Sequence, residues 1–227
     1  MSDRKHTSQH YEKLLRRLND RLLVMSSKSE LMIRDSIRAL VERSPSLARE
    51  VIRRDDEIDR MEIEIDELCL EIMALEQPVA SDLRFLTTAF KIVRDLERIG
   101  DVGVNIAERV EELMQEPELK PLIDLPIMAR TVEKILRDSF DAFVNSDASL
   151  GEQVVKDDEQ LDHMYEQIFR ELLTYMLEDP KSISRALKLI FIAKGLERVG
   201  DHCANIGEMV VFLVKGQDIR HGKSSDS

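Results

Sequence analysis

Residues 96–106 of this chain read LERIGDVGVNI, and residues 196–206 read LERVGDHCANI. A second pair of similar stretches lies upstream of these, VIRRDDEIDRM at 51–61 and VVKDDEQLDHM at 154–164. Repetition on this scale indicates that the chain contains two copies of one structural unit. We therefore expect the same elements, in the same order, in each half of the chain.

Apolar residues recur at the i, i+3, i+4, i+7 spacing of an amphipathic helix in six segments. Aromatic residues make up only 4% of the chain and Trp is absent, a composition that favours helices over strands. Short connections make each half an up-down-up bundle. We thus predict an all-α protein of two tandem homologous three-helix bundles. The expected helices span 11–42, 45–76, 81–114, 127–145, 150–177 and 183–214.

Helix ends are marked by capping residues and prolines. Ser44 followed by Pro45 is typical of a helix start, because Ser caps the free N–H groups and Pro suits the first helical position. Three prolines predict an extended connection between the bundles: Pro117, Pro121 and Pro126. The predicted domains are a first bundle at 1–118, a second bundle at 119–216 and a polar tail at 217–227.

Charge and composition exclude several classes of protein. With 33 Lys and Arg against 45 Asp and Glu, the formal net charge is -12, which argues against nucleic acid and anionic lipid as partners. Residues 1–10 lack the apolar core of a secretory signal, and the longest apolar stretches, 189–193 and 209–214, are much shorter than the roughly 20 residues of a membrane span. Cys69 and Cys203 lie in apolar helical patterns, which indicates buried thiols in a reducing compartment. We expect a cytoplasmic protein that meets a membrane only through partners.

Each copy carries an acidic stripe along its third helix. At 100° per residue, the spacing of these residues places them on one flank of the apolar face, and the preceding helix adds an i, i+4 pair of Asp. Antiparallel packing of the two helices would bring stripe and pair together. The residues are Glu97, Asp101, Asn105 and Glu108 with Asp55 and Asp59 in the first copy, and Glu197, Asp201, Asn205 and Glu208 with Asp158 and Asp162 in the second.

Gathered carboxylates repel one another, so something positive is expected beside them. One interpretation is a bound cation, because carboxylate and amide oxygens suit hard ions such as Fe, Zn, Mn, Mg or Ca. The other is pairing with the basic residues of the same helices, Arg94, Arg98, Lys194 and Arg198. Spacing alone leaves both open. Two details favour a close-packed site: the Asn common to both stripes, and helix-interior glycines that each cost up to about 1 kcal/mol, Gly100, Gly103, Gly200 and Gly207.

Catalytic motifs are absent from the sequence. It has no nucleophile-and-base motif, no phosphate-cradling Gly loop and no spaced Cys pair. His202, beside Asp201, is a weaker candidate ligand because its counterpart in the first copy is Val102. We expect a non-enzymatic protein. The alternatives are a metal-dependent helical-bundle enzyme, of di-iron or phosphohydrolase type, and a structural scaffold whose acids pair with Arg and Lys.

The two Leu-Glu-Arg-x-Gly-Asp motifs, the Asp-rich stretches upstream and the turn QPVASDLR at 77–84 together resemble the PhoU family, the accessory regulators of bacterial phosphate-specific transport. The similarity extends over essentially the whole chain and includes VKGQDIRH at 214–221. The resemblance implies two three-helix bundles, acidic metal-binding motifs on the bundle surface and a role without catalysis.

The resemblance also implies partners and site residues. PhoU proteins act with PstB, the ATP-binding subunit of the phosphate ABC transporter, and with the sensor histidine kinase PhoR, restraining uptake and the starvation response when phosphate is plentiful. A homodimer is expected. By matching position, the motif acids are Glu97, Asp101, Glu197 and Asp201, with Asp55, Asp59, Asp158 and Asp162 opposite. Some relatives have an acid where this chain has Asn105 or Asn205, and the amides lower the charge of the site.

Overall fold

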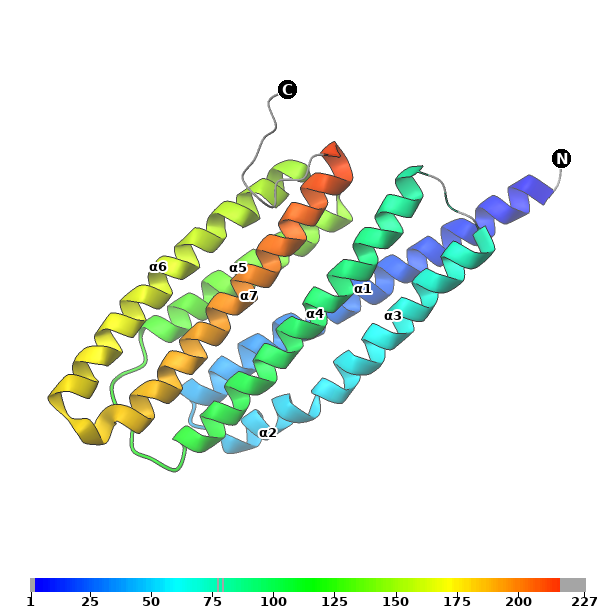
Figure 1. The fold of residues 1–227 in the computed structure, drawn as a ribbon. Helices are drawn as coiled ribbons and strands as arrows, with labels where there is room; N and C mark the ends of the chain where they lie inside the picture. Colours follow the sequence, from blue (N-terminus) through cyan, green and yellow to red (C-terminus); the bar gives the residue numbers. More distant parts are fainter. Residues whose placement is uncertain (1–2, 77, 79, 217–227) are drawn as a thin grey trace, which may run out of the picture.

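We describe the protein from a computed structural model, in which residues 3–76, 78 and 80–216 are placed. All regular structure in this part of the chain is helical, which confirms the all-α prediction (Figure 1). The helices are α1 Asp3–Val41, α2 Pro45–Arg53, α3 Asp55–Glu76, α4 Ala80–Leu113, α5 Asp124–Val144, α6 Ala148–Glu178 and α7 Ile183–Lys215, with a 3-10 turn, η1 Pro180–Ser182, before α7.

The single helix expected over 45–76 is in fact two helices, α2 and α3, that meet at Arg54. The Arg54 N–H bonds to the carbonyl of Val51, so the backbone tightens here instead of continuing the α-helical pattern. The Arg54 guanidinium donates to Asp35 Oδ2 of α1 at 2.6 Å and to Glu50 Oε1 at 2.5 Å. This tertiary contact accounts for the break, and it leaves Asp55 in the first turn of α3.

Two other helix starts differ from the prediction. α1 begins at Asp3 rather than Tyr11, and α5 begins at Asp124, so Pro126 lies in its first turn and not in the connection. Proline is tolerated there because the first N–H groups of a helix have no intrahelical partner. The start at Ser44 and Pro45 is confirmed, since Ser44 Oγ accepts a hydrogen bond from the Leu47 N–H at 3.4 Å.

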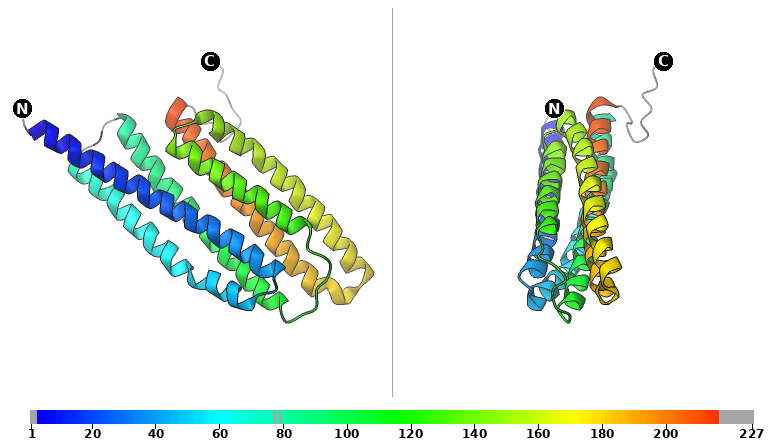
Figure 2. Two further views of the ribbon diagram at one scale, coloured as in Figure 1. Left: turned by 180° about the vertical axis from the view of Figure 1, so that it is seen from behind. Right: turned by 90° about the vertical axis from the view of Figure 1, so that its left-hand side faces the viewer.

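The helices form two layers (Figures 1 and 2). In one layer α3, α4, α7 and α6 lie side by side, with α4 packed antiparallel along α7 at the centre. α1 and α5 pack on one face of this layer and contact each other, and α2 packs against α1 and α4. The two copies of the repeat are therefore joined along α4–α7 and α1–α5.

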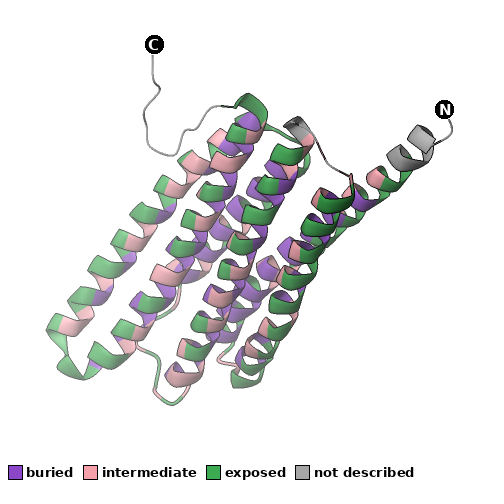
Figure 3. Cartoon of the chain, turned by 45° about the vertical axis from the view of Figure 1, so that its right-hand side comes forward, coloured by how far each residue is buried: buried purple, intermediate pink, exposed green. Residues whose placement is uncertain are grey.

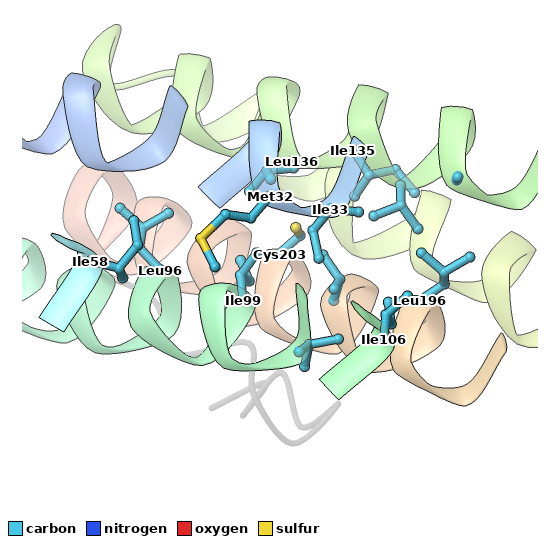
Figure 4. Packing of buried hydrophobic residues seen from close by; sticks show 14 of the residues in the cluster. Met32, Ile33, Ile58, Leu96, Ile99, Ile106, Ile135, Leu136, Leu196 and Cys203 are labelled. Atoms are coloured by element: carbon cyan, nitrogen blue, oxygen red, sulfur yellow. The ribbon is translucent and has the colours of Figure 1, made fainter. Parts of the chain in front are cut away.

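One continuous apolar core serves both copies. Met32, Ile33, Ile99, Leu136 and Cys203 come from α1, α4, α5 and α7 and belong to the same buried cluster (Figure 4). Buried residues follow the inward side of each helix and exposed residues the outer side (Figure 3). The boundary between 1–118 and 119–216 stays a prediction from the sequence repeat, and the tail 217–227 lies outside the described residues.

Both cysteines are buried free thiols, as expected. Burial raises the pKa of Cys69 to about 12 and raises that of Cys203 as well. Among the described helices, none combines the length and the apolar character that a membrane span requires.

Candidate functional site

The acids of the second copy converge where α6 crosses α7. Asp158 of α6 lies against Gly200 of α7 so closely that a Cβ at residue 200 would overlap its Oδ1. That oxygen is buried and has no hydrogen-bond partner. Burial raises the pKa of Asp158 to about 7, with a further contribution from the negative charges of Asp201, Asp162 and Glu197. The predicted convergence of pair and stripe is therefore present in this copy.

The first copy gathers its acids in the same way, between α3 and α4. Burial raises the pKa of Asp55 to about 6, and the charges of Asp59 and Asp101 raise it further, with Glu108 also contributing. Gly100, the counterpart of Gly200, faces Ile58 instead of a carboxylate, because a Cβ added at residue 100 would lie 3.2 Å from Ile58 Cγ2. In the first cluster the acid is thus not packed against this glycine as Asp158 is against Gly200.

Glu97 and Glu197 complete the clusters. Burial raises the pKa of both carboxyl groups, and in each the Oε2 atom is buried without a hydrogen-bond partner. Each of these carboxyl groups also has a basic neighbour. Lys194 donates to Glu197 Oε1, and the Arg98 Nε lies 3.3 Å from Glu97 Oε2. Arg98 also donates to Asp101 Oδ2 at 2.8 Å.

Basic side chains therefore form ion pairs with only some of the acids in each acidic stripe. Arg98 and Lys194 contact the acids as the second interpretation expects, whereas Arg94 and Arg198 form no ion pair within the described part of the chain. Burying a carboxylate oxygen without a hydrogen-bond partner costs free energy, and a bound cation is one way to offset that cost.

The two Asn side chains lie at the edge of the acidic stripes. Both are exposed, and both line cavities between α4 and α7. Asn105 donates from Nδ2 to the backbone carbonyl of Asp101 at 2.8 Å. His202 also faces away from the acids: its Nδ1 lies 2.8 Å from Asp95 Oδ1 of α4.

Sequence reasoning missed Glu62 and Asp66. Burial raises the pKa of Glu62, and the charges of Asp66 and Asp59 add to the effect. Both residues continue the helical spacing of Asp55 and Asp59 along α3, so the signal was present in the sequence. Their counterparts in the second copy are Tyr165 and Phe169. A comparison of the two copies therefore does not reveal these two acids.

The carboxylate oxygens of the two clusters are suitable ligands for a hard cation. In this structure, however, they are not arranged as a coordination shell. Among the described residues, no three Asp, Glu, His or Cys side chains stand close enough together to hold an ion. The buried oxygens of Asp158, Glu97 and Glu197 that accept no hydrogen bond from a described residue are donors of the right type, although Glu97 Oε2 is ion-paired with Arg98.

These features define a class: a tandem-repeat helical protein with an acidic cluster on each copy. The family model described as the PhoU domain matches the chain twice, at residues 22–110 and 125–210. The chain belongs to the PhoU family, as the resemblance implied.

Similar proteins match over nearly the whole chain. The phosphate-specific transport system accessory protein PhoU homolog of Pseudomonas putida is 42% identical over 217 residues, which cover 95% of this chain and 85% of that protein. The crystal structure of PhoU from Pseudomonas aeruginosa superposes with a TM-score of 0.88 at 39% identity, covering 91% of this chain and all of that one. PhoU from Streptococcus pneumoniae, described as a phosphate transport system regulatory protein, gives 0.85 at 28% identity, covering 93% of this chain and all of that one.

Proposed function

We propose that this protein is a non-enzymatic regulator of phosphate uptake and phosphate homeostasis. In this role it restrains the phosphate ABC transporter and the sensor-kinase signal of the starvation response when phosphate is plentiful. The observation that carries the proposal is the match of both repeats, over 95% of the chain, to a protein named as an accessory protein of phosphate-specific transport.

The proposal is tested by deleting the gene and growing the strain in high phosphate. Uptake of labelled phosphate and a starvation-gene reporter should both rise, and the wild-type gene should restore them. Unchanged uptake and reporter expression in the deletion strain would contradict the proposal.

The partners in this proposal are the transporter's ATP-binding subunit PstB and the sensor kinase PhoR, met in the cytoplasm, with the protein acting as a homodimer. Pull-down with each purified partner, with and without added metal, tests the contacts. Size-exclusion chromatography with light scattering tests the dimer, and a monomeric mass at micromolar concentration would contradict it.

We further propose that each acidic cluster holds a cation of the hard class, such as Fe, Zn, Mn or Mg. The buried oxygens of Asp158 and Glu197 that lack a hydrogen-bond partner among the described residues support this proposal. The ion would supply the positive charge that the raised pKa values of Asp55 and Asp158 indicate is missing.

Elemental analysis of the purified protein tests the metal proposal, beside an Asp101→Asn, Asp201→Asn double variant. Wild type should retain metal after gel filtration and the variant should lose most of it. Negligible metal in both proteins would favour the scaffold alternative, in which the acids pair only with Arg and Lys.

A further inference from the structure

The α4–α7 seam contains two cavities beside the acidic clusters. The first seam cavity, of about 400 Å³, is lined by Lys91, Arg94, Asp95 and Arg98 of α4 and by residues of α7 that include His202, Asn205 and Glu208. The second seam cavity, of about 180 Å³, is lined by Lys194, Arg198 and Phe191 of α7 and by Asn105 and Arg109 of α4.

The two seam cavities are related by the internal repeat. Arg94 and Lys194 hold equivalent positions in the two copies, as do Arg98 and Arg198, and Asn105 and Asn205. Because α4 and α7 run antiparallel, each cavity receives this equivalent pair of cations from one copy and the Asn from the other. Lys91 adds a third cation to the first cavity, and Arg109 adds one to the second. The same three polar positions therefore line both cavities.

Positive charge at the seam is only partly neutralised. Arg98 contacts Glu97 and Asp101, Lys194 contacts Glu197, and Arg109 contacts Glu112. Lys91, Arg94 and Arg198, in contrast, form no ion pair with any described residue. Within the described part of the chain, no acidic side chain lines the second seam cavity. Lys91 and Arg94, which have no ion pair among the described residues, both line the first seam cavity, together with the carboxylates of Asp95 and Glu208.

The first seam cavity has an additional polar group. His202 Nδ1 lies 2.8 Å from Asp95 Oδ1, and both side chains are mostly buried, with 18% and 16% exposed. This contact orients the ring and leaves Nε2 as the nitrogen that can bond a ligand. In the second seam cavity the equivalent residues are Val102 and Gly195, so the larger cavity is also the better equipped one.

We propose that the first seam cavity binds a phosphate group, either as inorganic phosphate or as the terminal phosphate of a nucleotide. Guanidinium groups match two phosphate oxygens at once, an ammonium group adds a point charge, and the Asn amide can donate a neutral hydrogen bond. His202, whose Nδ1–H faces Asp95, offers Nε2 as an acceptor for a hydroxyl group of a protonated phosphate. The positions of the Lys and Arg side chains in this cavity come from the structure alone. The choice of phosphate among oxyanions rests on the proposed function.

Equilibrium dialysis of labelled phosphate against the purified protein, at about 0.15 M salt to screen nonspecific attraction, tests the proposal. A Lys91→Gln, Arg94→Gln variant should bind at least about 10-fold more weakly, because it removes two charged hydrogen-bond donors from the cavity. The matched control is Lys13→Gln, Arg17→Gln, which removes the same charge from exposed positions of α1 and should leave binding unchanged.

Competition identifies the ligand. Displacement of labelled phosphate by ATP more effectively than by unlabelled phosphate would assign the site to a nucleotide, and the reverse to the free ion; both support a phosphate site. Absence of saturable binding below about 10 mM, equal affinity of the Lys91→Gln, Arg94→Gln variant, or equal competition by sulfate would overturn it. Any of these failures leaves the uptake phenotype of the deletion strain unaffected, so the two proposals fail separately.

Discussion

The Asp158 carboxylate occupies the space that a side chain at Gly200 would fill. An added Cβ at residue 200 would overlap Asp158 Oδ1 and would come within 2.5 Å of Leu161 Cδ1. The glycine therefore allows α6 and α7 to approach closely and allows an acid to be buried between them.

We expect Gly200→Ala to lower the free energy of unfolding by about 1–2 kcal/mol, because overpacking costs more than the helix propensity of Ala returns. Urea unfolding followed by circular dichroism measures the change. Gly100→Ala is the matched control: the nearest atom to its Cβ would be Ile58 Cγ2, at 3.2 Å, instead of the overlap with Asp158 Oδ1 at residue 200, so the change should stay within about 0.5 kcal/mol. Equal losses in the two variants would refute the argument.

Asp158→Asn should change the pH dependence of stability. The folded carboxyl titrates at about 7 because burial and neighbouring acids raise its pKa, whereas the unfolded carboxyl titrates near about 4. Between these values the folded protein keeps a proton that the unfolded chain has lost, so this group's contribution to stability falls as pH rises from about 4 to about 7. The variant should lack this decline and, at pH 8, exceed wild type by on the order of 1 kcal/mol after solvent screening.

The adjacent Asp157 provides a control of opposite sign. Burial raises its pKa, but hydrogen bonds from Lys134 and Gln153 outweigh burial and lower the pKa overall. Its stabilising contribution is therefore present at neutral pH and lost as pH falls through the lowered pKa. Asp157→Asn should be slightly less stable than wild type at pH 8. Thermal melts of the Asp157→Asn and Asp158→Asn variants at several pH values measure these effects. If stability changed with pH in the same way in both variants, the opposite pKa shifts of the two residues would be contradicted.

Arg54→Ala should destabilise the protein by about 2 kcal/mol, because it removes the main partner of a buried acid. The Asp35 side chain is only 3% exposed, and Arg38, 3.3 Å from its other oxygen, compensates only in part. Arg53→Ala, one residue earlier and exposed, should change stability by less than about 0.5 kcal/mol. Adding Asp35→Asn to Arg54→Ala should recover part of the loss; no recovery would show that the buried charge is not the cause.

The two thiols should resist modification until the protein unfolds. Cys69 and Cys203 are both fully buried, and burial raises the pKa of each thiol. A thiol-reactive chromogenic reagent at pH 8 should therefore label neither residue in native protein and both in denaturant. Rapid labelling of native protein at either position would show that the helices around it open readily.

Helix content and the repeat were readable from residues that lie close together in the chain. Apolar periodicity located every long helix, and the two copies of Leu-Glu-Arg-x-Gly-Asp established the internal symmetry, because both signals depend only on local spacing. The pairing of Asp55 and Asp158 with the stripes of the next helix was also predictable, since short loops force consecutive helices to pack antiparallel.

Tertiary structure alone decided which distant residues meet. The break at Arg54 depends on Asp35 of another helix, and the partner of His202 is Asp95 of the other copy, not the adjacent Asp201. Asn105 and Asn205 share a stripe with the acids in sequence, yet they line the seam, because α4 and α7 pack against each other on that side. Helical spacing specifies the face on which a residue lies, whereas the helix that covers this face is selected by packing of the whole core.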